Sequence, residues 1–263
     1  MNESSPPLAA LRAQVAALDG AKLSDSRRFV LGVESLDHRL GGGLPRARLH
    51  EMFAASTEDR GALAGLALML AICVGQGPLL WIRQESGVRA VGRLYGPGLA
   101  ELGLDPARLV EIVAPDEAGL LRAAGDAVRC PALSAVLIEP MGARGLDLTS
   151  SRRLAVAAEK SGVTILLLHG VAEPGPSAAY SRWRVRSRGS ARLDAGAPGH
   201  PAMELELLRH RGGVPGLRIC LEWNRDELAF REAALSGAPF SLPADGPAGA
   251  PDRDRGGGDR LSA

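Results

Sequence analysis

The fold is decided by one stretch, Leu49-His50-Glu51-Met52-Phe53-Ala54-Ala55-Ser56-Thr57-Glu58-Asp59-Arg60-Gly61, in which a short apolar strand (49–53) runs into a polar loop. A strongly apolar helix follows between Leu63 and Cys73. Nucleotide-binding proteins place the pattern G-x-x-x-x-G-K-[ST] in such a loop. This loop lacks the opening glycine and the lysine, and the whole chain contains lysine only at Lys22 and Lys160. The segment therefore has the outline of a phosphate loop without its chemistry.

Two interpretations of this loop remain open at the level of sequence. Glu58 and Asp59 place negative charge at a helix N-terminus, where a phosphate would otherwise bind. In the first interpretation the loop is a degenerate nucleotide site, and its remnants are Ser56, Thr57 and Gly61. In the second it was never a phosphate site, because strand–loop–helix units are common and an acidic first turn is ordinary helix capping.

The composition sets limits on the class of protein. A length of 263 residues with 46% hydrophobic residues fits one large α/β domain with tails. The net charge of +1 argues against a generally basic, DNA-coating protein, although a local basic patch remains compatible with it. The three cysteines lack metal-ligand or redox spacing, so we expect no metal and a reducing cytoplasm. The longest apolar stretch, 62–74, is too short to span a bilayer, so no membrane partner is expected.

The pattern divides the chain into three parts. Residues 1–28 are predicted to form an amphipathic helix and a linker, and residues 29–235 the core domain. Residues 236–263 form a Gly/Pro/Asp/Arg tail that we predict to be disordered, because too few apolar side chains offset its ordering entropy. The apolar stripe of the N-terminal helix consists of Leu8, Leu11, Val15 and Leu18. This stripe packs either on its own domain or on a partner, and the sequence leaves both open.

Within the core, predicted strands and helices alternate. The strands are expected at 49–53, 78–82, 109–113, 134–139 and 163–168, and the helices at 63–73, 87–103 (broken at Gly96-Pro97-Gly98), 117–129 and 148–160. Such alternation predicts an α/β fold with a mainly parallel central sheet flanked by helices. Three later segments, 183–187, 203–211 and 217–223, alternate in polarity and are predicted to add antiparallel strands at the C-terminal edge.

Several segments, in this order, resemble the RecA family of recombinases. The segment Gly32–Arg46 (GVESLDHRLGGGLPR) is similar to the glycine-rich element that precedes the phosphate loop in that family, and 49–53 takes the place of the strand that follows it. Residues 81–85, 135–139 and 164–169 are similar to the next three strands of the family's core. The resemblance runs from about Val30 to Trp223 and implies a RecA-like core.

The resemblance assigns roles to three residues at strand ends. Glu85 matches the glutamate that activates water in active members, Glu139 stands in place of the Walker B aspartate, and His169 replaces a nucleotide-sensing glutamine. Because the loop lysine and its neighbouring Ser/Thr are missing, nothing remains to position phosphates and Mg²⁺ between the carboxylates. We therefore predict no cofactor and no catalysis. The alternative is that all three are ordinary polar side chains at strand ends.

Within that superfamily the chain is most similar to the ImuA family. The similarity is carried by 42–46 with 49–51, by 178–185, and by 205–213 with 221–224. It implies a non-catalytic RecA-like adaptor in damage-induced (SOS) translesion DNA synthesis, acting with an ImuB-type Y-family-like protein and an error-prone DnaE-type polymerase. RecA, DNA and a second copy of the chain are further candidate partners. Two alternatives stay open, namely a modulator or antagonist of RecA filaments and an ATPase with an unconventional phosphate loop.

The densest basic run of the chain contains four alternating arginines, Arg182, Arg184, Arg186 and Arg188. On a strand they share one face, where their guanidinium groups could bind DNA phosphates without reading sequence. Trp183 is offset by one residue and is predicted to point to the other face, which disfavours base stacking from the arginine surface. The alternative is a solvated strand face or pairing with acidic residues elsewhere in the chain.

Overall fold

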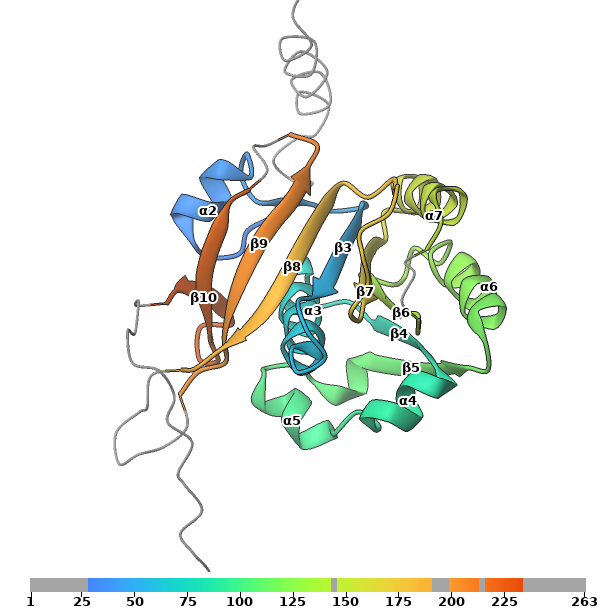
Figure 1. The fold of residues 1–263 in the computed structure, drawn as a ribbon, viewed down its shortest axis with the longest axis horizontal. Helices are drawn as coiled ribbons and strands as arrows, with labels where there is room; N and C mark the ends of the chain where they lie inside the picture. The colour runs from blue at the N-terminus through green and yellow to red at the C-terminus, as the bar shows by residue number, and fades with distance from the viewer. Residues whose placement is uncertain (1–27, 143–145, 191–198, 213–215, 234–263) are drawn as a thin grey trace, which may run out of the picture.

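The computed structural model describes residues 28–142, 146–190, 199–212 and 216–233, and its centre is a nine-stranded sheet (Figure 1). The strands lie in the order β11 (Ala229–Glu232), β10 (Arg218–Asn224), β9 (Ala202–His210), β8 (Ser181–Arg188), β3 (Leu49–Ala54), β7 (Thr164–His169), β6 (Ala135–Glu139), β4 (Leu79–Gln84) and β5 (Leu109–Ala114). From β8 to β5 every neighbouring pair is parallel, and β9, β10 and β11 continue the sheet in antiparallel pairs. The predicted mixed α/β class is confirmed.

Two details at the C-terminal edge differ from the sequence-based prediction. β8 pairs in parallel with β3 and only its other edge pairs antiparallel, with β9. β11 was not predicted, because its four residues are too short a run to stand out from a loop. The antiparallel extension therefore begins one strand later and ends one strand further along than the pattern indicates.

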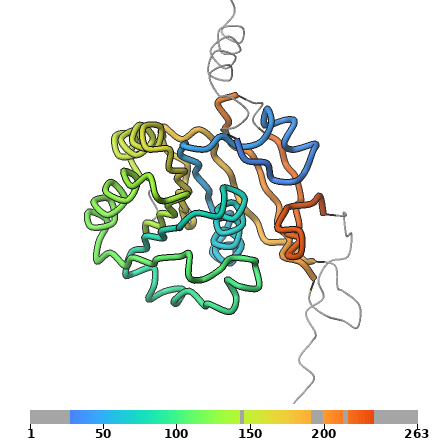
Figure 2. The backbone as a smooth tube through the Cα atoms, turned by 180° about the vertical axis from the view of Figure 1, so that it is seen from behind, coloured from blue at the N-terminus to red at the C-terminus, as the bar shows by residue number. Residues whose placement is uncertain are grey.

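Helices cover the two faces of the sheet in separate groups. Helix α3 (Arg60–Val74) packs on one face, and Figure 2 shows it there beside the N-terminal segment that holds α2 (Glu34–Arg39). Helices α6 (Glu117–Ala127) and α7 (Leu148–Ser161) pack on the opposite face, over β3, β4, β6 and β7. Since these central strands are covered on both sides, most of their residues are apolar, as in buried parallel strands. The buried exceptions include His50 and Glu51 of β3 and Arg83 of β4.

The stretch predicted as one broken helix at 87–103 forms two short helices. These are α4 (Glu85–Val91) and α5 (Gly96–Glu101), so the chain leaves the helix at 92–95 and not at Gly96-Pro97-Gly98. Pro97 lies in the first turn of α5, where its missing N–H costs no hydrogen bond and its fixed φ suits a helix. Proline here begins a helix, which corrects the predicted position of the break. A short 3₁₀ turn, η2 (Pro106–Arg108), then leads into β5.

The glycine-rich element before β3 folds into a compact cap. Strands β1 (Arg28–Phe29) and β2 (Leu44–Pro45) pair with each other, and α2 lies between them in the chain. Asp37 of α2 accepts hydrogen bonds from the backbone N–H groups of Leu31 (2.9 Å) and Gly32 (3.1 Å). At Gly43, with φ of 100°, a methyl group would lie 2.3 Å from the carbonyl oxygen of Phe29, so only glycine fits.

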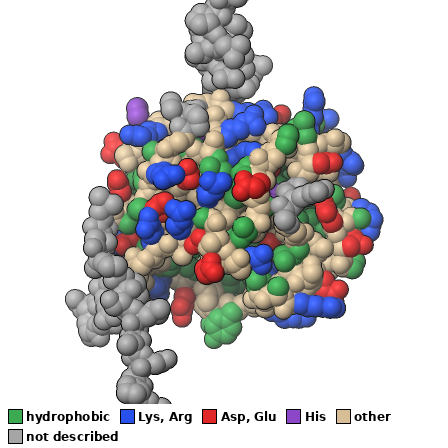
Figure 3. Space-filling view, viewed as in Figure 1, with side chains coloured by type: hydrophobic (Ala, Val, Ile, Leu, Met, Phe, Trp, Pro, Cys, Tyr) green, Lys and Arg blue, Asp and Glu red, His purple; other side chains and the backbone are tan. Residues whose placement is uncertain are grey.

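Beyond β3 the sheet has one apolar and one charged face. Trp183, Val185 and Leu205 are buried on the side of α3. The other side of β8, β9 and β10 carries alternating arginine and glutamate side chains, and Figure 3 shows blue and red groups mixed over these strands. Among the residues that the structure describes, none forms a helix over this face (Figure 1). Trp183 lies on the face opposite the arginines, as its offset predicts.

The helices of the described ranges are either too short or too polar to cross a lipid bilayer.

Candidate functional site

The parallel strands bring the candidate residues to one edge of the sheet. β3, β7, β6 and β4 are neighbours and point the same way, so their carboxyl ends meet. The loop 55–59 follows β3, Glu139 and His169 are the last residues of β6 and β7, and Glu85 follows β4 directly. Ligands of open parallel sheets bind at this edge. The sequence-predicted remnants therefore lie where a nucleotide site would be.

Asp59 immediately precedes helix α3, and its carboxylate binds Ser56 and Ser187 without capping the helix. Its Oδ1 accepts hydrogen bonds from the Ser187 backbone N–H (2.7 Å) and hydroxyl (2.8 Å), and its Oδ2 accepts one from the Ser56 hydroxyl (2.9 Å). Burial would raise the pKa of Asp59, but these hydrogen bonds outweigh it and leave that pKa below its usual value. A buried negative charge in the loop after β3 is thus bound to the end of β8.

The loop also turns its backbone amides toward its own chain. The Ala55 N–H donates to the Val185 carbonyl oxygen (2.9 Å). Within the loop, the Asp59 N–H donates to the Ser56 carbonyl oxygen (3.2 Å) and the Arg60 N–H to that of Thr57 (3.4 Å). A phosphate loop leaves such amides free to surround the anion. Of the remaining predicted remnants, Thr57 is exposed and Gly61 lies in the first turn of α3, where an added methyl group would meet no atom within 4 Å.

Arg60 was missed by sequence reasoning, which looked for lysine alone. Position by position, the loop Ala54–Gly61 places Arg60 at the lysine of the phosphate-loop pattern. Its guanidinium packs against Gly170, just after β7, where a methyl group would approach Arg60 Nη2 to 3.2 Å. Within the described residues Arg60 Nε is buried without a hydrogen-bond partner. The chain therefore has a cation at this position, but the arginine side chain differs from lysine in length and in the geometry of its hydrogen-bond donors.

The two strand-end carboxylates are bound to arginines of the same chain. Glu85 is about half exposed and accepts a hydrogen bond from Arg89 (2.7 Å) one helical turn away. Glu139 accepts one from Nε of Arg83 (2.9 Å), a β4 side chain that is only 4% exposed. Arg83 also binds Glu111 of β5 (3.0 Å), so it links three strands. Arg83 lies in the apolar strand Leu79–Gln84, and a lone charge in such a run is the signal that could have pointed to this ion-pair cluster.

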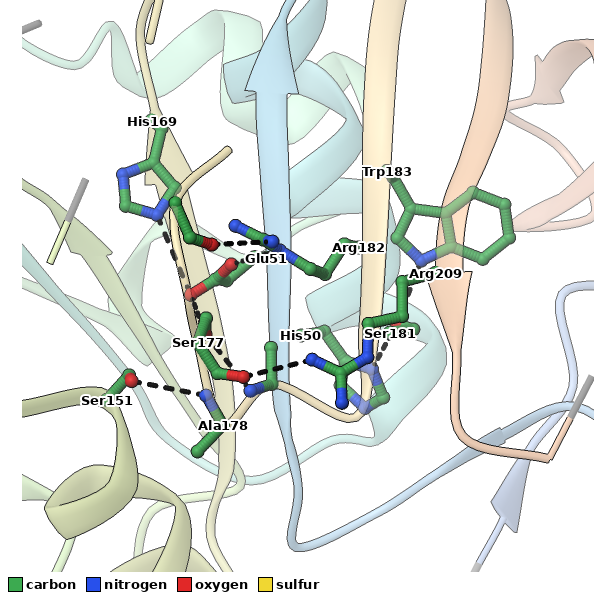
Figure 4. Close-up of polar contacts among 12 residues, drawn as sticks. His50, Glu51, Ser151, His169, Ser177, Ala178, Ser181, Arg182, Trp183 and Arg209 are labelled. Atoms are coloured by element: carbon green, nitrogen blue, oxygen red, sulfur yellow. Dashed lines mark hydrogen bonds and ion pairs between the residues drawn. The ribbon is translucent and has the colours of Figure 1, made fainter. Parts of the chain in front are cut away.

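His169 belongs to a buried polar cluster that we call the Glu51 cluster: Glu51, His169, Ser177 and Arg182 (Figure 4). Glu51, on β3, is 1% exposed; it accepts hydrogen bonds from Arg182 Nε (2.7 Å) and Ser177 Oγ (2.5 Å), and His169 Nε2 lies 3.9 Å away. Phe53 stacks on the His169 ring at 4.6 Å and lies under the Arg182 guanidinium at 5.1 Å. The cluster ties β3, β7 and β8 together.

The electrostatics of the Glu51 cluster favour a stable ion pair. Burial on its own would raise the pKa of the Glu51 carboxyl. Contacts with His169 and Ser177 and the charge of Arg182 outweigh that effect, so the pKa lies below its usual value. Ser177 donates directly to the carboxylate, whereas in a serine nucleophile arrangement the hydroxyl donates to an imidazole. The geometry is that of a buried ion pair that stabilises the packing of neighbouring strands.

The four arginines of β8 lie on the sheet face that carries Glu51, as their alternation predicts, and each is paired with a glutamate. Arg182 is buried against Glu51. The other three meet two glutamates of β9: Arg184 with Glu206 (3.6 Å), Arg186 with Glu204 (3.2 Å), and Arg188 also with Glu204. The glutamates alternate in the sequence of β9, and that pattern could have indicated the pairing. Contact of this face with DNA stays a prediction.

The predicted N-terminal helix and the predicted tail at 236–263 lie outside the described residues. Leu8, Leu11, Val15 and Leu18 belong to the part of the chain that the structure does not describe. Across the described ranges, no group of three His, Cys, Asp or Glu side chains is arranged to hold a metal ion.

The fold and the site define an α/β protein in which the loop after β3 holds an internally bound carboxylate. No protein-family model matches the chain. Two relatives are similar to it: Protein ImuA of Caulobacter vibrioides strain NA1000 / CB15N and Protein ImuA of Caulobacter vibrioides strain ATCC 19089 / CIP 103742 / CB 15. Each is 35% identical over 223 residues, which cover 77% of this chain and 82% of the relative. The chain belongs to the ImuA family.

Proposed function

We propose that this chain is a non-catalytic adaptor in damage-induced (SOS) translesion DNA synthesis. In this proposal it acts in the cytoplasm with an ImuB-type protein and an error-prone DnaE-type polymerase, as membership of the ImuA family implies. Its α/β core is RecA-like, which is supported by the chain order of β3, β4, β6 and β7 and by their neighbouring positions in the sheet. The core serves as a scaffold that presents binding surfaces.

The carboxylate of Asp59 is the observation that carries the proposal. Two unit charges of like sign 4 Å apart repel by about 4 kcal/mol at the effective dielectric of a protein surface. A nucleotide phosphate at the start of α3 would meet this charge, and Ser187 and Ser56 hold the carboxylate in place. Arg60 supplies one cation nearby, but the amides of Asp59 and Arg60 are engaged with their own loop. A phosphate at this loop would therefore meet a like charge and would find two of the loop amides already engaged.

Calorimetric titration with ATP and Mg²⁺ tests this proposal. We expect no saturable heat at nucleotide concentrations up to about 1 mM, where a binding free energy of only about −4 kcal/mol would be detected. The same preparation should form a complex with purified ImuB-type protein, with the same affinity whether or not ATP is present. Arg60→Ala is the matched variant, because it removes the one cation at the lysine position.

Two results would contradict the proposal. A micromolar Kd for ATP that is lost in Arg60→Ala would show a working nucleotide site in this loop. Failure of the folded protein to associate with the ImuB-type protein would remove the adaptor role, whatever the nucleotide result.

A further inference from the structure

A second surface, outside the edge described above, is formed by the outward side of α7 and the end of α6. It is a groove of about 830 Å³ whose walls include Leu148, Arg152, Val156, Lys160 and, from the α6 end, Arg129. Leu148, Arg152 and Val156 are four residues apart, so they lie along one side of the helix. Leu148 is 50% exposed and Val156 is 44% exposed, which leaves an apolar strip open to solvent. In Figure 3, basic, acidic and hydrophobic side chains lie next to each other at the upper right, over α6 and α7.

The charge of this α6–α7 groove differs from that of the β8 face. On β8, Arg184, Arg186 and Arg188 each form an ion pair with a glutamate of the next strand. In the groove, Arg152, Arg153 and Lys160 form no ion pair with any residue that the structure describes. Three acidic residues lie nearby in the chain: Asp126 binds Arg129 (3.3 Å), Glu159 pairs with Arg48, and Asp147 accepts from the Ser150 backbone N–H (2.7 Å). Among the described residues, the groove therefore presents three cations without an ion-pair partner beside exposed aliphatic side chains.

We infer that the α6–α7 groove binds an acidic, amphipathic segment of a partner protein. Aliphatic side chains of the segment would seat on Leu148 and Val156, and its carboxylates would pair with Arg152, Arg153 and Lys160. This is the helix-in-groove mode of peptide recognition, with charge complementarity around an apolar strip. The inference rests on the proposed adaptor role, because an adaptor needs a surface of this kind, but the groove itself is defined by geometry and charge.

A protein segment fits this groove better than a nucleic acid does. Single-stranded nucleic acids bind where cations follow the backbone and aromatic side chains stack on the bases. None of the described residues that line the groove is aromatic. The exposed apolar strip has no use in phosphate binding, whereas apolar patches rimmed by polar residues mark protein interaction sites. The groove thus offers charge attraction and a seat for aliphatic groups together.

The test compares charge and apolar variants of the groove with a matched surface control. Arg152→Glu/Arg153→Glu/Lys160→Glu reverses the three cations that lack an ion-pair partner in the described residues. Val156→Gln removes the apolar contact and introduces a better helix former than valine. Arg93→Glu is the control, because Arg93 is exposed and lies outside the groove. The milder Arg152→Gln/Arg153→Gln pair replaces the triple variant if circular dichroism shows a changed fold. The probes are full-length ImuB-type protein, 20-residue peptides tiling it, and fluorescein-labelled oligothymidylate.

We expect wild-type protein to capture peptides that share negative charge and aliphatic residues about one turn apart. The triple variant should bind these peptides and the full-length partner at least about tenfold more weakly, and Val156→Gln several-fold more weakly, whereas Arg93→Glu should bind as wild type does. Unchanged partner binding by the groove variants would overturn the groove inference and leave the adaptor role standing. A loss confined to oligothymidylate would overturn it in favour of nucleic acid. Wild-type protein that binds neither partner nor peptides would refute both proposals.

Discussion

The substitution Glu51→Gln removes one charge from the Glu51 cluster with almost no change in volume. Glu51 is 1% exposed and holds Arg182 Nε at 2.7 Å. Glutamine can still accept from Ser177, but it leaves the guanidinium of Arg182 buried without its counter-ion. Among the described residues, the Gly175 carbonyl (2.9 Å) and the ring of Phe53 (5.1 Å) then remain to stabilise that charge.

The expected cost follows from the burial of the pair. Removing one partner of a buried ion pair costs about 3–5 kcal/mol, because it leaves an uncompensated charge in a medium of low dielectric. Since Arg182 keeps its contacts with the Gly175 carbonyl and the Phe53 ring, we expect a loss of stability at the lower end of this range, about 3 kcal/mol. A domain has about 5–15 kcal/mol of stability in total, so the variant should fold but with much less margin.

Urea unfolding at pH 7, followed by circular dichroism, measures this cost. With a slope of about 3 kcal/mol per molar urea, the midpoint should fall by about 1 M. Glu206→Gln is the matched control, since its partners Arg184 and Arg218 lie on the solvent side of the sheet and such pairs contribute at most about 1 kcal/mol. The double variant Glu51→Leu/Arg182→Met should recover most of the loss, because it removes both charges.

The pH dependence provides a second check on the same residue. The folded-state pKa of Glu51 is depressed, so the unfolded state binds the proton more readily. The contribution of Glu51 is therefore present at neutral pH and is lost as the pH falls through the folded-state value. A loss below about 1 kcal/mol in Glu51→Gln, or a double variant as unstable as the single one, would refute the reasoning that charge pairing holds β3 to β8.

Two further predictions concern buried histidines and the β8 face. Burial lowers the pKa of His50 and of His210 to about 4, so folding keeps both neutral while the unfolded chain takes up protons near pH 6.5. Stability is therefore unaffected by these histidines above their unfolded-state pKa. Below it, the free energy of unfolding should fall by about 1.4 kcal/mol per histidine and pH unit on acidification toward pH 4. Urea midpoints between pH 7 and pH 4.5 measure this fall, and His50→Gln should make it less steep. If the β8 face binds DNA, Arg186→Ala/Arg188→Ala should reduce the salt dependence of oligothymidylate affinity by about two phosphate contacts, as measured by fluorescence anisotropy at several salt concentrations. An unchanged salt slope would mean that these two arginines contact Glu204 and not DNA. Arg182 is a poorer choice for this test, because replacing it would also remove the ion-pair partner of Glu51.

The sequence predicted the local elements because their signals are local. Apolar runs such as 164–169 and 135–139 are long enough for strands buried on both faces, and the helices between them require parallel connections. The position of the loop after β3 followed from the same pattern. The alternation in β8 likewise placed its arginines on one face, because side chains in a strand repeat every two residues.

Only the tertiary structure decided which partners these side chains meet. Glu51 and Ser177 are 126 residues apart in the chain, and Asp59 and Ser187 are 128 apart, so no periodicity connects them. The pairing of β8 with β9 depends on register, and a slip of one residue would have set apolar side chains opposite the arginines. Sequence periodicity determines which face a residue occupies, whereas contacts across the sheet are fixed by the packing of distant segments, and those contacts determine whether each charge is neutralised or free to bind.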